Sequence, residues 1–383
     1  MNNLHININE FTNASRVLKQ VNSLVNSNTF NKVIIIALGA DNLRDFEHIS
    51  DRVELYRINL WTRKLPKNLV CQIFKYIEFF FKAIVLISKV KPAVVNAHAL
   101  SVLPIASLSK LLFKSNLVYD AHELETERNG SSGVRKKLNK FIENKLINYV
   151  DMTLVVSESI ADWYKNEYKI QRPPVIMNAP KFRELKVNNH FREQLGIRAE
   201  QIILLYQGGL SSGRGVNLIL DAFKARSDDR LVVVFMGYGV LEQEIKIAAQ
   251  QHNNIFFFPA VSPQVVLEYT ASADVGIHII QNTCLNHDFC MPNKLFEYAM
   301  AGLPVMVSNM KDMSELVIKN NMGVAINDFS VEGINNTLDA FLREDLSQMK
   351  QNAYRVACEN AWEVQAKKMF KAYQAMFKET GVK

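Results

Sequence analysis

Short, continuous apolar runs alternate with longer amphipathic stretches along the whole chain, and this alternation constrains the fold more than any other feature. Residues 33–38 and 231–235 contain apolar residues only. A run without a polar face is typical of a parallel strand that is buried on both sides. Because helix-length stretches separate the runs, the pattern predicts βαβ units and an α/β fold with doubly wound, Rossmann-like sheets.

The expected elements follow this alternation from end to end. In the first half we expect strands at 4–8, 33–38, 53–58, 93–96, 117–119, 152–156 and 175–177, and helices at 16–25, 69–90, 103–113, 134–149 and 159–166. In the second half we expect strands at 202–206, 231–235, 255–258, 275–278 and 304–307, helices at 216–225, 241–250, 263–272 and 294–300, and helical structure from about 331 onward.

The alternation pauses once, in the polar residues 178–200, and this pause marks a domain boundary. A chain of 383 residues has room for two or three domains at roughly 100–200 residues each. The expected organisation is an α/β domain at 1–178, a second α/β domain at 179–361 and a terminal helix at 362–383. Two doubly wound domains facing each other leave a cleft, and ligands of such sheets bind beyond the carboxyl ends of the strands.

The composition excludes several classes of protein. Hydrophobic residues make up 48% of the chain and charged residues 22%, which excludes a disordered or collagen-like chain. The four cysteines contain no C-x-x-C pair, so neither a zinc site nor a disulfide framework is expected. No secretory leader is recognisable, and residues 93–109 are too short and polar for a membrane span. We expect a cytoplasmic protein, either free or bound peripherally at the inner face of the plasma membrane.

The net charge of +7 is unevenly distributed. Residues 1–180 carry a net charge of +8 and residues 181–383 a net charge of −1. An anionic partner on one side of the molecule follows, and nucleic acid, anionic lipid and a phosphorylated substrate all fit this asymmetry.

Two basic segments in the first half are candidates for an anionic membrane surface. Residues 67–91 contain many aromatic and aliphatic side chains, and Lys75, Lys82 and Lys89 recur every seven residues on one helix face. Residues 135–145 form a second basic cluster. Basic, aromatic amphipathic helices are typical of contacts with anionic headgroups. The alternative is that the apolar side chains pack on the sheet and the lysines are solvated.

The most informative motif is the segment 291–305, which predicts a short helix followed by a strand. Asn293 is a good helix N-cap after Pro292, and the helix N-terminus offers free amide groups to a phosphate. Lys294 adds a positive charge, and Glu297 can accept two hydrogen bonds from a ribose diol. The alternative is an ordinary capped helix in which Lys294 and Glu297 form an ion pair.

Glycine-rich turns follow two strands of the second half. Gly208 and Gly209 allow a ligand to approach the backbone closely, and Arg214 in the same turn can contact a diphosphate. Gly237 lies in the turn after the next strand. A P-loop is excluded because no G-K-[ST] follows, and a tight strand-to-helix turn is the alternative interpretation.

Two histidines, His98 and His122, follow strands of the first half. In a parallel sheet these positions lie at the same edge, where ligands bind. A single histidine after a strand is more often structural, whereas two at corresponding positions indicate function as often as structure. The adjacent glutamates of residues 123–127 form either an acidic loop or a helix start.

At this point the motifs resemble a known family. The segments YQGGLSSGRGV, FMGYGVLEQEI and PNKLFEYAMAGLPVMVS occur in this order, preceded by YDAHELETE in the first half. This set is similar to the family 4 (group 1) glycosyltransferases of the GT-B fold, in the variant with PNKLFEY. The resemblance covers nearly all of the chain from about residue 92 to 380. The terminal helix resembles the one that crosses back to the first domain in that family.

The resemblance implies roles for individual residues. Glu297 matches the glutamate that holds the donor ribose, and Arg214 matches the basic residue that contacts the diphosphate. Asn293 to Leu295, with Lys294 between them, would lie beside the phosphates. His122 matches the histidine near the transferred sugar. The catalytic candidates are therefore His122, Arg214 and Lys294, and Gly208, Gly209 and Gly237 complete the expected donor site.

Two positions depart from the family pattern. Phe289 stands where the family often has a second glutamate, and Gly209 stands where it often has an arginine. The departure at Phe289 leaves open which group contacts the hydroxyls of the sugar, and the nearby candidates are Asn286, His287 and Asp288, together with His98. Arg214 and Lys294 remain as the main cations for the leaving diphosphate.

The resemblance implies transfer of a sugar, with retention of configuration, from a nucleotide-diphosphate sugar to a glycan or lipid-linked acceptor in polysaccharide synthesis. We expect neither a metal nor another cofactor, because the cations can serve and the pair Asp228–Asp229 is typical of a turn. The alternatives are a nucleotide-sugar epimerase or hydrolase and a non-catalytic partner in polysaccharide assembly. Nucleic acid is not an expected partner, because the basic segments contain no recognisable reading motif.

Overall fold

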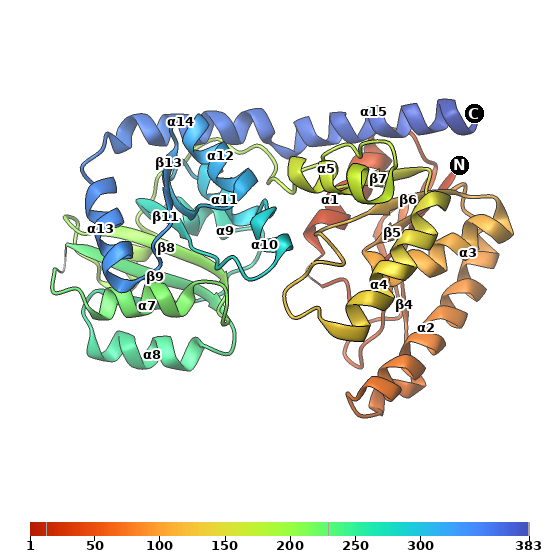
Figure 1. Ribbon diagram of the computed structural model, residues 1–383, viewed down its shortest axis with the longest axis horizontal. Helices are drawn as coiled ribbons and strands as arrows, with labels where there is room; N and C mark the ends of the chain where they lie inside the picture. Colours follow the sequence, from red (N-terminus) through yellow and green to blue (C-terminus); the bar gives the residue numbers. More distant parts are fainter. Residues whose placement is uncertain (13, 229, 382–383) are drawn as a thin grey trace. The chain divides into compact units, whose positions relative to one another are not determined.

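The computed structural model describes residues 1–12, 14–228 and 230–381, so Asp229 of the Asp228–Asp229 pair lies outside the described residues. The chain divides into two compact units (Figure 1). Unit 1 comprises Met1–Ile176 with Ala366–Lys383, and unit 2 comprises Met177–Gln365. Each unit is built on a sheet of parallel strands with helices packed on it, as the alternating apolar runs predicted.

The sheet of unit 1 has seven strands in the order β3-β4-β2-β1-β5-β6-β7. Its strands are β1 (Asn2–Ile6), β2 (Lys32–Leu38), β3 (Phe46–Ser50), β4 (Val53–Ile58), β5 (Val94–His98), β6 (Asn116–Asp120) and β7 (Met152–Leu154). All neighbours are parallel except the edge pair β3–β4, which is antiparallel. The strand expected at 175–177 is wrong in extent, because the structure has only a single bridge between Val155 and Val175 there.

Five long helices surround this sheet. They are α1 (Ser15–Asn26), α2 (Leu69–Val90), α3 (Leu103–Phe113), α4 (Gly133–Leu146) and α5 (Glu158–Tyr168), with 3-10 turns at Trp61–Lys64, Leu100–Val102 and Ile147–Tyr149. The side chain of Asn68 caps α2 by accepting a hydrogen bond from the amide of Cys71. None of the helices in the described ranges combines the length and hydropathy that a bilayer-spanning helix requires.

The sheet of unit 2 has six parallel strands in the order β10-β9-β8-β11-β12-β13. They are β8 (Ile202–Gly209), β9 (Leu231–Tyr238), β10 (Ile255–Pro259), β11 (Val275–His278), β12 (Val305–Ser308) and β13 (Gly323–Ile326). The helices are α6 (His190–Leu195), α7 (Val216–Lys224), α8 (Glu242–Gln251), α9 (Val266–Thr270), α10 (Leu285–Asp288), α11 (Asn293–Met300), α12 (Lys311–Lys319), α13 (Val331–Phe341) and α14 (Leu346–Asn360). Apolar side chains fill both faces of the sheet, which explains the runs without polar residues.

The last helix, α15 (Trp362–Thr380), belongs to both units. The amide of Trp362 donates to the carbonyl of Pro180 at 2.8 Å, and the amide of Met177 donates to the side chain of Gln365 at 3.0 Å. These bonds keep the first turn in unit 2, so the units divide a few residues from the expected boundaries at 178 and 361. From Ala366 onward the helix packs within unit 1, where the Tyr373 hydroxyl donates to Asn96.

Candidate functional site

Glycines shape the carboxyl ends of β8 and β9. Gly208 and Gly237 are paired across the two strands, and a Cβ on Gly237 would lie 1.9 Å from the carbonyl oxygen of Gly208. Gly215, which precedes α7, has φ 77° and lies so close to Ile279 that a Cβ would be 1.7 Å from its carbonyl oxygen. No larger residue fits at these two positions without moving the backbone. Gly209, by contrast, has open space around it.

Lys294 supplies a buried cation at this strand end. Its Nζ atom is buried without a hydrogen-bond partner in the described part of the chain, and it lies 4.2 Å from the centre of the Tyr206 ring. The same atom lies 3.3 Å from the position that a Cβ would take on Gly208. An unpartnered ammonium beside bare glycine backbone is suited to an anion. The predicted alternative, an ion pair with Glu297, is wrong for this structure, because the Lys294 amine reaches no partner.

The charges around Lys294 act on its protonation. Burial, followed by the positive charge of Arg214, lowers the pKa of Lys294 to about 7, while Glu297 opposes this change. Arg214 itself is exposed, in the turn between Gly213 and Gly215. Arg214 also acts on the pKa of His278, so the cations expected to contact the diphosphate lie in the same region of unit 2.

Glu297 is held in place by a chain of hydrogen bonds. Gln207 donates from Nε2 to a carboxylate oxygen of Glu297 at 2.5 Å, and its Oε1 accepts from the hydroxyl of Thr270 at 2.7 Å. The amide of Gln207 donates to the Tyr298 hydroxyl at 3.0 Å. Gln207 is thus a positioning residue for Glu297 that the sequence reading missed; its only signal is its place just before Gly208.

The start of α11 differs from the predicted one by one residue. Pro292, with φ −74° and ψ 143°, is the N-cap, and Asn293 is the first helical residue. The predicted capping role of Asn293 is therefore wrong, because the fixed φ of proline already suits this boundary. The amide of Leu295 donates to the carbonyl of Pro292, and its side chain is buried. The amides of Asn293 and Lys294 remain as the helix donors for an anion.

The segment that carries the expected sugar contacts precedes α11. The ring of His287 reaches the carbonyl of Gln281 at 2.9 Å through Nδ1, while Asn286 is buried and Asp288 is half-buried. Phe289 lies 5.6 Å from the amine of Lys311, ring centre to Nζ, and offers no carboxylate. His278, at the end of β11, is a further buried polar side chain that the sequence reading did not single out. Burial, together with Lys294 and Arg214, lowers the pKa of His278 well below its ordinary value.

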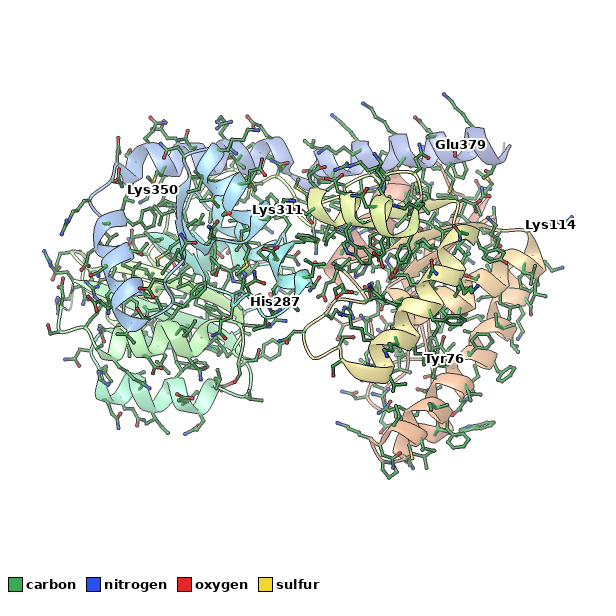
Figure 2. All side chains as sticks on the ribbon, in the orientation of Figure 1. Tyr76, Lys114, His287, Lys311, Lys350 and Glu379 are labelled. Atoms are coloured by element: carbon green, nitrogen blue, oxygen red, sulfur yellow. The ribbon has the colours of Figure 1, made fainter. Side chains whose placement is uncertain are left out.

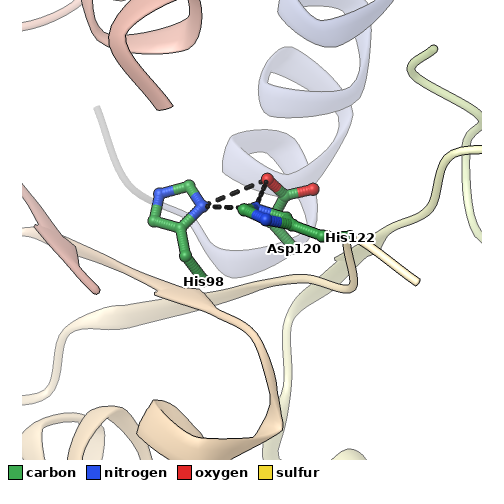
Figure 3. A group of neighbouring side chains, drawn as sticks. All are labelled: His98, Asp120 and His122. Carbon is green, nitrogen blue, oxygen red and sulfur yellow. Dashed lines mark hydrogen bonds and ion pairs between the residues drawn. The ribbon is translucent and has the colours of Figure 1, made fainter. Parts of the chain in front are cut away.

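In unit 1, His98, Asp120 and His122 form a connected cluster at the carboxyl ends of β5 and β6 (Figure 3). Asp120 Oδ2 lies 3.1 Å from Nδ1 of His98 and 2.9 Å from Nε2 of His122, and the two rings meet at 3.1 Å. His5 of β1 lies behind His98, with 2.8 Å between Nδ1 and Nε2. Arg16 of α1 donates to Asp120 at 2.6 Å.

This cluster has a fixed charge arrangement. Burial alone would raise the pKa of Asp120, but Arg16 and the histidines hold it well below its usual range. Burial lowers the pKa of His98 to about 4, so His98 is neutral near pH 7. The three side chains have the spacing of metal ligands, but the buried guanidinium of Arg16 already neutralises Asp120. A divalent ion there would lie beside a buried cation, which disfavours metal binding.

The basic segments are only partly as expected. Lys75 donates to the carbonyl of Leu65 at 2.8 Å and Lys82 to that of Asn59 at 2.7 Å, so these lysines fasten the segment that precedes α2. Lys89 is exposed. On the outer side of α2 several large apolar side chains are also exposed; they are Leu69, Val70, Ile73, Phe74, Ile77, Phe81 and Val85. The alternative in which the apolar side chains pack on the sheet is therefore wrong for these seven residues, whereas Phe79 and Ile87 are buried.

Two families match separate parts of the chain. Residues 29–179 match glycosyltransferase family 4, and residues 187–356 match glycosyl transferases group 1. No curated protein sequence matches the chain.

Solved structures resemble the whole chain at low identity. Sucrose-phosphate synthase from Thermosynechococcus elongatus has a TM-score of 0.82 and 14% identity, over 99% of this chain and 100% of that chain. HepE of Anabaena in complex with UDP-glucose has a TM-score of 0.73 and 14% identity, over 98% and 100%. WaaG, a glycosyltransferase involved in lipopolysaccharide biosynthesis, has a TM-score of 0.69 and 16% identity, over 97% and 98%. At this identity the structures establish the fold, which is GT-B, while the two family matches establish the enzyme class. The chain is a glycosyltransferase of the group 1 and family 4 type.

Proposed function

We propose that the enzyme transfers a sugar, with retention of configuration, from a nucleotide-diphosphate sugar to a glycan or lipid-linked acceptor in cell-surface polysaccharide synthesis. The observation that carries the donor half of this proposal is the buried, unpartnered Nζ of Lys294 beside the backbone of Gly208. A bound diphosphate would give this amine the negatively charged partner that it lacks in the structure.

The proposed chemistry depends on electrostatic stabilisation. As the bond to the sugar breaks, negative charge gathers on the diphosphate, and Lys294, Arg214 and the first amides of α11 stabilise it. Glu297, oriented by Gln207, accepts hydrogen bonds from the ribose hydroxyls. The assignments of His122 and His98 to the sugar stay predictions. No step in this scheme calls for a metal or another cofactor.

Relatives of the same fold support the choice of donor and pathway. HepE has been solved with UDP and with UDP-glucose, and WaaG is described as acting in lipopolysaccharide biosynthesis. We extend these properties to the present chain as a proposal, since identity to each is below one fifth.

Calorimetric titration with nucleoside diphosphates and nucleotide sugars tests the donor site. We expect one nucleotide to bind, and Lys294→Gln and Glu297→Gln to weaken it roughly 10- to 100-fold, as expected for lost bonds to charged groups. Lys319→Gln, an exposed lysine of α12, is the matched control. Equal affinity in all variants would contradict the proposal. NMR of the product anomer then tests retention, and donor turnover without acceptor would favour the epimerase or hydrolase alternative.

A peripheral membrane location is the second part of the proposal. The exposed Phe74 and Phe81 of α2, and the exposed Phe141 of α4, are suited to the interfacial region of a bilayer. The proposed location is the cytoplasmic face of the plasma membrane. Flotation with vesicles of anionic and of zwitterionic phospholipid tests whether the protein binds a membrane surface. We expect the protein to bind anionic vesicles, and we expect both added salt and the variant Phe74→Ser/Phe81→Ser to weaken this binding. Failure to float with either kind of vesicle would contradict the proposed membrane location.

A further inference from the structure

Unit 1 contains a cavity of about 760 Å³ whose lining includes none of the clustered histidines. It lies between α2, the start of α3, α4 and the loop at residues 125–131, and Tyr76, labelled in Figure 2, reaches it from α2. Much of the lining is apolar; these side chains are Tyr76, Leu100, Pro104, Phe141, Ile142 and Leu146. Its volume is in the range of small-ligand sites, roughly 300–1,000 Å³.

The cavity also carries unbalanced positive charge. Of its three cations, Arg128 is balanced by Glu125 at 2.8 Å and by Glu123 at 2.9 Å. Arg135 and Lys145, both exposed on α4, form no ion pair with any residue that the structure describes. Two uncompensated charges beside an apolar cavity are suited to an anionic group that is attached to an apolar one.

The apolar lining continues onto the surface. Phe141 lines the cavity and is nevertheless 59% exposed, and its neighbours on α4, Val134 and Leu138, are exposed as well. On α2, Phe74 and Ile77 flank Tyr76 in the sequence and are exposed. Exposed apolar side chains on the same two helices therefore offer further contacts to a hydrocarbon chain that extends out of the cavity.

We propose that this cavity binds one molecule of a single-chain amphiphile with a phosphate head, the lipid carrier of the acceptor. The phosphate lies at Lys145, next to the apolar side chains of α4, while Arg135, ten residues earlier on the same helix, adds a second positive charge to the lining. The first part of the hydrocarbon chain lies against Tyr76, Ile142 and Leu146. This assignment rests on the proposed transfer to a lipid-linked acceptor and adds the site and the chemistry that recognise the lipid. It differs from docking on a membrane surface because it requires a stoichiometric site for a single molecule.

The test is a titration of the full-length protein with dodecyl phosphate below its critical micelle concentration. The comparison ligands are dodecyl glucoside, which keeps the chain without the charge, and inorganic phosphate, which keeps the charge without the chain. We expect saturable one-to-one binding of dodecyl phosphate, at least tenfold tighter than either comparison ligand. Equal binding of inorganic phosphate, or binding only to phospholipid vesicles, would overturn the proposal.

Variants connect this binding to the cavity. Arg135→Gln/Lys145→Gln is expected to weaken dodecyl phosphate at least tenfold, whereas Lys165→Gln/Lys371→Gln, with the same change of charge on exposed lysines of unit 1, is expected to leave it unchanged. Ser101→Trp, at an exposed position in the lining, is expected to fill the cavity and reduce binding of the chain. Equal loss in both double variants would contradict the site.

The assay separates this proposal from the proposed function. It needs no donor, no acceptor and no turnover, so a failed amphiphile titration leaves the donor site untouched. Nucleotide binding is expected to be unchanged in Arg135→Gln/Lys145→Gln. Conversely, loss of nucleotide binding in Lys294→Gln is expected to leave the dodecyl phosphate affinity as it was.

Discussion

The buried amine of Lys294 lowers the stability of the ligand-free protein, and this cost is explained if Lys294 binds a ligand. A buried amine without a partner destabilises a fold by about 1–3 kcal/mol relative to a side chain that needs no hydrogen bond. No hydrogen bond or ion pair with a residue that the structure describes offsets this cost, and the carboxylate of Glu297 is bonded to Gln207. An unrelieved cost at one residue is typical of a binding site rather than of a structural core.

Lys294→Met is therefore expected to act in opposite directions on stability and binding. The variant removes the desolvated charge while it keeps a chain of similar length, so the midpoint of thermal unfolding should rise. Nucleotide affinity should fall roughly 10- to 100-fold, because a charge-assisted bond to phosphate is lost. Differential scanning calorimetry with and without nucleotide measures both effects. A lower unfolding midpoint without ligand would show that the amine has a structural partner.

The same lysine predicts a dependence of binding on pH. Its pKa is lowered to about 7 in the free protein, by burial and by Arg214, while Glu297 opposes the change, and His278 is neutral beside it. Above pH 7 a diphosphate must bring a proton onto Lys294, so the affinity should fall by up to about tenfold per pH unit. Calorimetry in two buffers of different ionisation enthalpy measures the proton uptake. Lys294→Met should abolish it.

The stability of the ligand-free protein should rise with pH, whereas the nucleotide affinity falls. The folded pKa of Lys294 lies below its ordinary value of 10.5, so the unfolded chain binds more protons between these values. The contribution of this residue to the free energy of unfolding therefore rises as the pH rises from 7. Chemical denaturation at several pH values, compared between wild type and Lys294→Met, isolates this contribution. A difference between the two proteins that does not change with pH would exclude a titrating Lys294.

The sequence predicted site residues that lie in or next to a motif, whereas it did not predict the residues that contact them from far away in the sequence. His98 and His122 follow predicted strands, and this position singled them out, together with the motif resemblance for His122. Arg16 and His5 contact the same cluster from more than ninety residues away in the sequence. Nothing in a single sequence marks such a pairing, because it depends on the order in which the strands lie in the sheet.

At the scale of elements, one carboxylate fastens α4 to its neighbours. Glu143 is fully buried and accepts hydrogen bonds from the hydroxyls of Tyr119, Tyr164 and Tyr168 at 2.6 to 2.7 Å. These tyrosines come from β6 and α5. The outer face of α4 is exposed, including Val134, Leu138 and Phe141, so α4 packs against the rest of unit 1 on one side only. The hydrogen bonds of Glu143 therefore contribute to holding α4 in place.

Glu143→Leu is expected to lower the free energy of unfolding by about 3 kcal/mol or more, since it leaves three buried hydroxyls without their acceptor. Glu143→Gln keeps an acceptor oxygen and is expected to cost less. Asn144→Leu, at the exposed neighbouring position, is the control. Urea denaturation measures the three variants. A cost for Glu143→Leu no greater than that of Asn144→Leu would exclude this role.

The strands that the sequence predicted most clearly share one physical property. β2 and β9 are buried on both faces, so their sequences contain no polar residue over several positions. The edge strand β3 was not predicted, because its alternating exposed residues contain no apolar run, and the edge strand β13 was missed although its four residues are apolar. The polar residues 178–200 likewise concealed α6, whose six residues bury only Phe191. Burial on both sides leaves a clear mark in the sequence, and short one-sided elements do not.

At the scale of the whole molecule, α15 contributes to the stability of unit 1 from the other end of the chain. The Tyr373 hydroxyl donates to Asn96, whose Nδ2 in turn donates to Asn3, and Thr380 accepts from Asn116 at 2.9 Å. Phe30 contacts the rings of Tyr373 and Phe377. Strands β1, β5 and β6 of unit 1 are therefore linked to residues 373–380 of α15.

The variant Tyr373→Phe tests whether the two units differ in stability, because it is expected to destabilise unit 1 and not unit 2. The variant removes the donor to the buried Asn96 and is expected to cost about 1–3 kcal/mol. This cost should fall on unit 1, since Tyr373 bonds to Asn96 of β5 and packs against Phe30. Hydrogen exchange followed by mass spectrometry should show faster exchange in β1 and β5, with β8 and β9 unchanged. Added nucleotide should slow exchange near β8 and β9 in both proteins, because its proposed site lies in unit 2. Faster exchange of β8 and β9 in the variant would mean that the two units unfold as one.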